Sequence, residues 1–470
     1  MATVTERLDK VISREAPVWG VRPTPDQVRR LSGLDFAVLW GDLALGLLVL
    51  VAGGLLIPSL SFPQALLAIV LGSAIGCVPL ALVGRAGARE GVPGMVLLRH
   101  ALGIRGSYVP SALNILQLLG WTAFELWAMA LVASRITGPI LGVSSFYIWL
   151  AVAALVCVAL SLGGPVLVVR RWMERFGVWV LGAAALWITV RVLTTVDLSA
   201  IWSQQGDNSF LTFGGGVDLV IALPVSWIPL VADYNRFARR GVSSAAGTFV
   251  GYLLGNVWFY ALGALLVLAG GAPIFPSPGD IGGAIVTLGG GTLVLVVLLV
   301  GETDEAFADI YSSAVSAQNL APRLKQRGAI VAVSAVAVGV AAWLFGLPSN
   351  GYLTYESFLL LIGSVFVPLF AVFLADYHLA NRGSYGEVRL FGDTTRFRPA
   401  AFVAWVLGFL VFHAFSPVGP EGWTSWVASV FRSVGLEHPL AGGNVPASLV
   451  AFAVSFGAAA LMLRRSGERG

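Results

Sequence analysis

The sequence predicts an all-α polytopic membrane protein with twelve transmembrane helices, and three observations lead to this prediction. Of the 470 residues, 57% are hydrophobic and only 11% are charged, whereas soluble domains carry roughly 25% charged residues. Apolar runs of about 20 residues, the length of a helix that spans the hydrocarbon core, recur along the whole chain. Lys and Arg residues are abundant in every second segment between these runs and scarce in the others, as they are across a membrane.

The apolar runs are expected to be helices, because lipid cannot satisfy open backbone groups and the runs lack the alternation of barrel strands. The first run follows 33 largely polar residues and is too long for the apolar region of a signal peptide. The predicted spans are residues 34–58, 62–84, 107–135, 146–168, 176–195, 217–238, 245–269, 284–319, 328–347, 352–376, 400–415 and 445–463. The segments outside them are an amino-terminal tail (1–33), a loop (377–399), an outer loop (416–444) between two peripheral helices (400–463), and a short tail (464–470).

The basic residues indicate which side of the membrane each segment faces. Of the 29 Lys and Arg residues, all except Arg135, Arg191 and Arg432 fall in the two tails or the even-numbered loops. The positive-inside rule places these segments, and therefore both termini, in the cytoplasm of a cell inner (plasma) membrane. The net charge of +4 follows from this sidedness and does not indicate a nucleic-acid partner.

Several motifs of catalysis are missing from the sequence. It contains no Walker phosphate loop, HExxH zinc motif or CxxC pair. Cys77 and Cys157 lie inside apolar runs and are expected to be small core residues. We therefore expect no cofactor and no enzyme, and any transport would run on an ion or solute gradient.

Acidic residues gather in the middle of the eighth span, in the segment GETDEAFADIYSSAVSAQNLAPR. Four acids facing lipid would cost roughly 10 kcal/mol, so they are expected to face protein, water or cations. Glu302, Glu305 and Asp309 follow i, i+3, i+7 and share one face of the helix, whereas Thr303 and Asp304 point elsewhere. The alternative is an internal hydrogen-bond network that only joins helices.

The third span places an aromatic ring beside a carboxylate at its centre. Trp121 lies near the middle of the span and Glu125 follows one turn later on the same face. An indole beside a carboxylate can stack on a flat ring and accept hydrogen bonds from its N–H groups. Core packing of Trp121, and a buried pair of Glu125 with a basic residue, are the alternatives, although no Lys or Arg lies at the centre of a span.

The sixth span contains two prolines at its centre. Pro224 and Pro229 flank Ser226 and Trp227, and each proline removes a helix donor and clashes with the carbonyl four residues earlier. A broken helix is therefore expected, with a simple kink as the alternative. Broken helices at the membrane midplane are a common way for transporters to hold substrate and ion.

The first span is also predicted to be interrupted. Gly41, Asp42 and Gly46 make this helix locally weak, although a buried helix–helix hydrogen bond could also explain the acid. Two interrupted helices five spans apart predict two inverted five-helix repeats, residues 34–196 and 217–376, that meet at a central site. Spans eleven and twelve lie outside this core.

Six sequence segments between residues 20 and 385 resemble the nucleobase–cation symporter family, the purine/cytosine permeases, and within it the hydroxymethylpyrimidine transporter branch. They are WGVRP before span one, WGD…GGLLIP in span one, GVPGMVLLRHALGIRGSYVP before span three, NILQLLGW in span three, LPVSWIPLVADYNRF in span six and PLFAVFLADYHL in span ten. Their order and their match to the predicted topology make the resemblance specific. It implies a five-plus-five inverted-repeat fold and import of planar heterocycles with Na⁺ or H⁺.

The resemblance also implies roles for individual residues. A family Trp that stacks on the base matches Trp121, and a Gln that hydrogen-bonds the base is Glu125 here, which favours an amidine or aminopyrimidine edge. The span-six aromatic corresponds to Trp227 with a small shift, and a substrate-binding Asn falls on Asp309. Ser226 lies beside this site.

The sodium-site residues of the family fall on Thr303 and Asp304, with backbone near Gly41. An acid at position 304 departs from the family pattern. It would either strengthen Na⁺ binding or carry a proton. Asp42, Glu302 and Glu305 complete the polar midplane.

The resulting hypothesis is a cation-coupled importer of a heterocycle such as cytosine, a purine or hydroxymethylpyrimidine. Trp121 and Trp227 would sandwich the ring, while Glu125 and Asp309 bind its N–H groups. A transporter of the same fold for allantoin, a hydantoin or an amino acid is the first alternative. The second is an integral-membrane enzyme that holds a divalent metal with Glu302, Glu305 and Asp309. The expected partners are the small substrate and the lipid bilayer.

Overall fold

The computed structural model describes residues 20–163, 177–274, 276–346, 351–392, 395–419 and 421–467. In these ranges the chain is almost wholly helical, and its only β-pairing is an isolated bridge between Leu31 and Ala238. The ends of three predicted spans, residues 164–168, 176 and 347, lie outside the described residues, as does most of the predicted amino-terminal tail.

Each of the twelve predicted spans overlaps a helix or a pair of helices. Seven described helices are long and apolar enough to cross a membrane, or eight with the bent pair α2–α3 counted as one span. The protein is therefore a multi-pass membrane protein. The helices that overlap the spans are α2 (Gly33–Asp42) with α3 (Leu47–Gly54), α4 (Phe62–Glu90), α6 (Tyr108–Leu141), α7 (Phe146–Gly163), α9 (Val178–Thr195), α11 (Phe213–Asn235), α12 (Gly241–Leu268), α14 (Gly291–Leu320), α15 (Gln326–Phe345), α16 (Gly351–Leu374), α18 (Pro399–Phe415) and α20 (Ala447–Gly467).

Shorter elements connect the spans. They are η1 (Asp26–Val28), α5 (Gly94–Leu102), α10 (Leu198–Ser203), α13 (Pro278–Thr287), the π-helical turn η3 (Ala375–Ala380), α17 (Gly386–Phe391), α19 (Glu421–Ser433) and η4 (Leu440–Gly443). The predicted eighth span, 284–319, was too long at its start, because residues 284–287 belong to α13 and α14 begins at Gly291. Gly290 separates the two helices with a φ of +90°, which favours glycine. Hydropathy did not reveal this turn because both helices are apolar.

The first span is broken as predicted, but the sixth is not. Helices α2 and α3 meet at an angle of 60° across a short break. Helix α11, in contrast, is one continuous helix that contains both Pro224 and Pro229, so the prediction of a break there was wrong. Neighbouring helices donate to its backbone: Gln117 Nε2 lies 2.9 Å from the Ser226 carbonyl oxygen, and Tyr260 Oη lies 3.1 Å from that of Leu219. A proline-containing helix can continue within a membrane where neighbouring helices pack around it, and residues Gly216–Asn235 of α11 are all buried.

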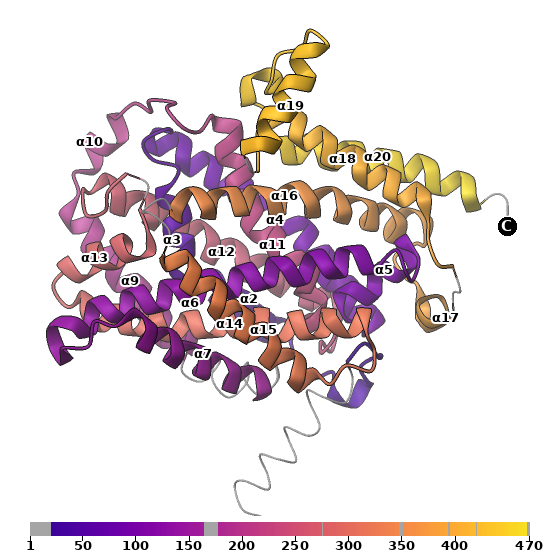
Figure 1. Cartoon of the computed structure of the whole chain (residues 1–470), viewed down its shortest axis with the longest axis horizontal. Helices are drawn as coiled ribbons and strands as arrows, with labels where there is room; N and C mark the ends of the chain where they lie inside the picture. Colours follow the sequence, from indigo (N-terminus) through magenta and orange to yellow (C-terminus); the bar gives the residue numbers. More distant parts are fainter. Residues whose placement is uncertain are drawn as a thin grey trace, which may run out of the picture.

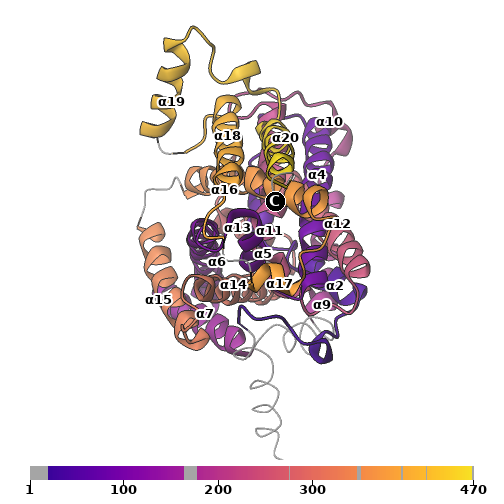
Figure 2. The same ribbon diagram turned by 90° about the vertical axis from the view of Figure 1, so that its right-hand side faces the viewer.

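The packing of the helices has the symmetry that an inverted repeat requires. Helices α2 and α3 pack on α12, and correspondingly α11 packs on α4. Helix α6 packs on α14 and α15, and α14 also packs on α7. Exchanging spans one to four with spans six to nine leaves this set of contacts unchanged, which is consistent with the predicted repeats. The peripheral pair α18 and α20 pack against each other and on α16, outside the core (Figure 2).

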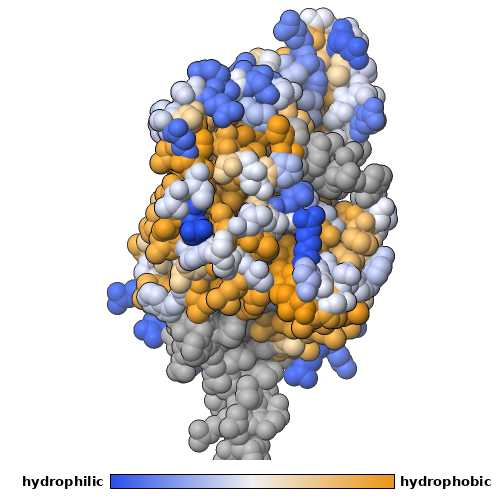
Figure 3. Space-filling model, turned by 90° about the vertical axis from the view of Figure 1, so that its left-hand side faces the viewer, coloured by the Kyte–Doolittle hydropathy of each residue, from blue (hydrophilic) through white to orange (hydrophobic). Residues whose placement is uncertain are grey.

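The long helices run along the long axis of the molecule, with α10 and α13 at one end and α5, α17 and the carboxyl terminus at the other (Figure 1). Hydrophilic residues lie across the end that carries α10 and α13, with apolar residues around them (Figure 3). Large apolar side chains such as Leu155, Trp179 and Leu293 are more than 70% exposed. These exposed side chains are expected to face lipid.

Candidate functional site

The break in span one brings backbone groups into the middle of the helix bundle. Gly46 is the N-cap of α3, and its extended backbone leaves the first amides of α3 without partners in their own helix. The Glu302 carboxylate of α14 accepts a hydrogen bond from one of these, the Leu47 N–H. A negative charge at this position is stabilised by the dipole of α3.

Gly46 also leaves room for two side chains from α14. A Cβ atom at this position would lie 2.9 Å from Glu302 Oε1 and still closer to Glu305 Oε1. Both contacts are shorter than real Cβ atoms show, so the close approach of these carboxylates requires glycine. The backbone angles of Gly46 (φ −98°, ψ 162°) are open to any residue. Glycine is therefore needed here because a side chain would not fit beside the two carboxylates.

Glu125 and Trp121 on α6 are buried and leave polar atoms without partners. Glu125 is fully buried, neither carboxylate oxygen has a hydrogen-bond partner, and the Trp121 Nε1 also has none. The Trp121 ring has edge-to-face contacts with Tyr355 (6.0 Å between ring centroids) and Phe358 (5.4 Å) of α16. The predicted indole–carboxylate pair therefore lies in an aromatic-lined part of the core.

Trp227 and Ser226 lie on α11. The Trp227 ring contacts Trp40 of α2 edge-to-face, with ring centroids 5.8 Å apart. The Ser226 hydroxyl donates to the Leu223 carbonyl in its own helix at 2.6 Å, so its polar contact with α6 is made by the backbone carbonyl. The aromatic partners recorded for Trp121 and Trp227 lie on different helices, α16 and α2.

Acidic side chains on α6 and α14 share a buried region that lacks basic partners. Glu125 is within electrostatic reach of Glu302, Glu305 and Asp309, all of which are at most 5% exposed. One oxygen of Glu302 and one of Asp309 have no hydrogen-bond partner. Among the described residues, Arg236 is the only Lys or Arg in the buried core.

Arg236 does not neutralise these acids. Its guanidinium donates to the Gly20 carbonyl at 2.6 Å, to the Tyr311 hydroxyl at 3.0 Å and to the Asp233 carbonyl at 3.2 Å. Bringing four carboxylates together in a dry region is costly unless each is protonated or meets a cation. This region could therefore hold protons or positive charge.

The residues predicted to bind a cation are only partly brought together. Asp42 at the end of α2 and Asp304 of α14 line one cavity of about 140 Å³ with Val180 and Leu181 of α9. Gly41 packs against Gly251 of α12. The Thr303 hydroxyl donates to the Val300 carbonyl in its own helix at 2.7 Å and faces a different cavity, beside α7.

Sequence reasoning missed several residues of this region. Gly46 was noted only as a weak point of span one, and Leu47, Tyr355 and Phe358 were not singled out. Tyr355 of α16 donates to the Leu48 carbonyl in the first turn of α3 at 3.0 Å. The acidic run in span eight was a signal that some backbone donor must face it, but the sequence does not show which one. In the described part of the chain, no three His, Cys, Asp or Glu side chains are arranged to hold a metal ion.

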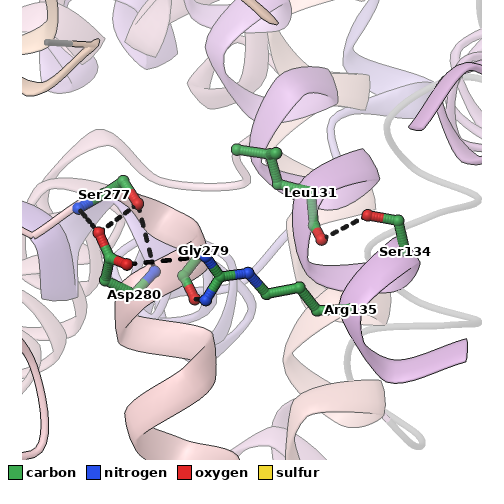
Figure 4. Close-up of polar contacts among 6 residues, drawn as sticks. All are labelled: Leu131, Ser134, Arg135, Ser277, Gly279 and Asp280. Atoms are coloured by element: carbon green, nitrogen blue, oxygen red, sulfur yellow. Dashed lines mark hydrogen bonds and ion pairs between the residues drawn. The ribbon is translucent and has the colours of Figure 1, made fainter. Parts of the chain in front are cut away.

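One polar contact joins helices at the end that carries α13. Arg135 near the end of α6 donates to the Gly279 carbonyl at 2.6 Å, and its guanidinium lies 3.7 Å from the Asp280 carboxylate (Figure 4). Asp280 also accepts from Ser277 in the capping box that begins α13. The positive-inside rule identifies this end as the outer one.

A second polar network lies at the opposite end. Asp376, in the π-helical turn that follows α16, lies 3.0 Å from His100 Nδ1 of α5 and accepts from the Tyr385 hydroxyl at 2.5 Å. Nearby, Asp233 of α11 accepts from the Gly94 N–H, the first residue of α5, at 2.9 Å. Both acids therefore contact α5, Asp376 through a side chain and Asp233 through the backbone.

Comparison with known proteins adds independent information on this region. A sequence model of the family described as permeases for cytosine/purines, uracil, thiamine and allantoin matches residues 23–436. The hydantoin permease of Microbacterium maritypicum is 26% identical over 381 residues, which are 77% of this chain and 75% of that protein. The allantoin permease of Bacillus subtilis is also 26% identical, over 83% of this chain and 85% of that protein. The cytosine permease of Escherichia coli K12 is 25% identical over 75% of this chain and 78% of that protein.

Solved structures match the fold over nearly the whole chain. Mhp1, a nucleobase-cation-symport-1 family transporter solved in a closed conformation with bromovinylhydantoin bound, superposes with a TM-score of 0.75 at 19% identity, over 95% of this chain and 96% of Mhp1. A Na⁺-coupled sialic acid symporter superposes with a TM-score of 0.64 at 12% identity, over 97% of this chain and 94% of the symporter. The chain therefore shares its fold with these transporters, while the inverted repeats and the more specific similarity to the hydroxymethylpyrimidine branch stay predictions.

Proposed function

Because the chain belongs to the family of permeases for cytosine, purines, uracil, thiamine and allantoin, we propose that it imports a flat, nitrogen-rich heterocycle by cation symport. It is a transporter and not an enzyme. Its sidedness supports placement in the cell inner (plasma) membrane with both termini in the cytoplasm.

The observation that carries this proposal is a group of buried polar atoms without partners on two neighbouring helices. They are the Trp121 Nε1, both carboxylate oxygens of Glu125 and one oxygen of Asp309. Leaving one buried polar group unsatisfied costs about 1–3 kcal/mol, and more for a charged group. A heterocycle whose edge carries N–H groups and a ring nitrogen would supply the missing partners.

We assign roles to the surrounding side chains on this basis. Trp121 and Trp227 would contact the two faces of the ring, and Glu125 and Asp309 would accept from its N–H groups. The Ser226 hydroxyl donates to the Leu223 carbonyl, and the Ser226 carbonyl accepts from Gln117. Ser226 would therefore form part of the wall of the site and would not donate a hydrogen bond to the substrate.

The coupling ion would bind where α2 ends. Asp42, Asp304 and backbone near Gly41 would hold Na⁺, or the Asp42–Asp304 pair would carry the proton of an H⁺ symporter. Thr303 could join a Na⁺ site only if its hydroxyl left the Val300 carbonyl. Thr303→Val should therefore leave uptake unchanged if the ion is a proton.

Cytosine, a purine or hydroxymethylpyrimidine is the substrate class that we test first. Hydantoins and allantoin are the second candidates, because relatives named for these compounds match about three quarters or more of this chain. Binding is measured as thermal stabilisation of the purified protein across these compounds, with and without Na⁺ and across pH.

Replacement of Glu125 tests the site directly. Glu125→Ala should abolish uptake of the selected compound into proteoliposomes while leaving expression and thermal unfolding close to wild type. Asp218→Asn is the matched control, because this buried acid accepts from the Ala447 and Ser448 amides of α20, away from the site. Uptake that survives Glu125→Ala unchanged would remove Glu125 from the site.

A further inference from the structure

We propose that the transported heterocycle carries a positive charge, as in a protonated amidine, guanidine or amino-heterocycle. This inference rests on the transport function proposed above and specifies the class of its substrate. Three observations support it: the excess of acidic side chains around α6 and α14, the hydrogen bond from the first amide of α3 to Glu302, and the aromatic rings around Trp121.

The first observation is an excess of buried negative groups. Glu302, Glu305 and Asp309 lie within electrostatic reach of Glu125, and all four side chains are at most 5% exposed. Both oxygens of Glu125 lack partners although the side chain is fully buried, so this carboxylate in particular requires a donor that the protein does not supply. A cationic N–H edge would supply donors and charge together.

A coupling ion at the break in span one would not balance this group by itself. Asp42 and Asp304 line a cavity together with residues of α9, whereas Glu125 projects from α6. Glu305 is within electrostatic reach of Asp42 and Asp304 as well as of Glu302 and Asp309, so the acids of α2, α6 and α14 form one group. One monovalent cation bound among them leaves most of these carboxylates without a positive partner.

The second observation concerns the positive end of the half-helix α3. A free helix N-terminus at this position would attract an anionic substrate, such as a carboxylate. Here the Glu302 carboxylate already accepts from the Leu47 N–H, and Glu305 lies against Gly46. This arrangement neutralises the helix end and disfavours anions at the site.

The third observation is the aromatic lining. Trp121, Tyr355 and Phe358 lie together, and Phe124 adds a ring 5.3 Å from Phe358. The faces of aromatic rings attract cations, most strongly when the cation is desolvated. A planar cation would therefore gain from the rings as well as from the acids.

The experiment compares flat compounds that differ mainly in charge. 2-Aminoimidazole is cationic at neutral pH and 2-imidazolone is neutral with a similar outline; benzamidine and benzamide form a second pair. Dissociation constants are measured by calorimetry on the purified full-length protein at pH 7, with and without Na⁺, and uptake is measured in proteoliposomes. We expect the cationic member of at least one pair to bind about 10- to 100-fold more tightly, the range of a hydrogen bond to a charged group.

Amide substitutions then test whether the acids produce this preference. Glu125→Gln keeps the shape and removes the charge, and it should reduce the ratio of cationic to neutral affinity about tenfold. Asp218→Asn is a buried acid-to-amide change away from the site and should leave the ratio unchanged. If the Glu125→Gln protein does not unfold as a single species, Asp309→Asn is used in its place.

The outcomes separate this inference from the proposed function. Neutral heterocycles that bind more tightly than their cationic partners, with ion-coupled uptake intact, would overturn the inference and keep the proposed function. A cationic preference that Glu125→Gln and Asp309→Asn both leave unchanged would also overturn it. If no heterocycle of either charge binds or is transported, both proposals fail.

Discussion

The substitution Gly46→Ala tests how closely the α14 carboxylates must approach the break in span one. Its Cβ would lie 2.9 Å from Glu302 Oε1 and closer to Glu305 Oε1, so at least one of these buried side chains must move. The backbone at position 46 is extended and accepts any residue, so the substitution adds no backbone strain. Its effect should therefore come from the displaced carboxylates.

The expected magnitude follows from the contact that is lost. The hydrogen bond from the Leu47 N–H to the Glu302 carboxylate has a charged acceptor, and such bonds contribute about 1.5–3 kcal/mol. The free energy of unfolding should therefore fall by about 1.5–3 kcal/mol. Uptake should fall as well, because the displaced Glu302 and Glu305 belong to the buried acids around Glu125.

The assay measures initial rates of uptake in proteoliposomes over a range of substrate concentrations, together with thermal unfolding of the purified variants. Gly363→Ala is the control, since Gly363 is a buried glycine in α16 whose added Cβ would meet its nearest atoms at 3.8 Å. We expect Gly363→Ala to transport like wild type. If Gly46→Ala shows wild-type affinity and rate, the carboxylates do not need their observed positions and our reasoning about the site is refuted.

Two further predictions concern the ends of the molecule. Arg135→Ala removes the contacts of α6 with Gly279 and Asp280; because the Arg135 side chain is 54% exposed, the ion pair contributes at most about 1 kcal/mol. Labelling of Ala284→Cys, a buried position on α13, by an impermeant maleimide should therefore become up to about fivefold faster. At the other end, His100→Phe keeps an aromatic ring against Tyr385 but leaves Asp376 with one partner fewer, and should lower the free energy of unfolding by about 1–3 kcal/mol.

Each of these predictions has a control variant. Arg432→Ala changes an arginine of α19 on the outer side and should not alter labelling of Ala284→Cys. If Arg135→Ala also leaves that rate unchanged, the Arg135 contact does not hold α13. His378→Phe replaces a half-buried histidine whose Nε2 has no partner, and should be tolerated. Equal unfolding of the His378 and His100 variants would show that the Asp376 hydrogen bond does not stabilise the fold.

The path of the chain through the membrane could be predicted from the sequence. Each apolar run overlaps a helix, and the break at Gly41–Gly46 was found because an acid and two glycines weaken a helix wherever they occur. The continuous course of α11 could not be predicted. Pro224 and Pro229 remove donors within the helix, but whether it breaks depends on the packing of helices such as α4 and α16 that are distant in sequence.

The importance of the midplane acids was likewise predictable, whereas their partners were not. Four carboxylates in an apolar span must face something other than lipid, and helical spacing places Glu302, Glu305 and Asp309 on one face. That Glu302 accepts from the Leu47 amide, and that Glu125 has no basic partner, depends on how α3, α6 and α14 pack.

The sequence by itself therefore determined that the chain crosses the membrane repeatedly, where span one weakens and which residues are polar at the centre. These properties depend on hydropathy and local backbone preference, which act over a few neighbouring residues. Tertiary structure alone decided that Gly46 makes room for two carboxylates and that Trp121 lies against α16 while Trp227 lies against α2. Contacts between helices depend on distances between residues up to hundreds of positions apart, and no local pattern specifies them.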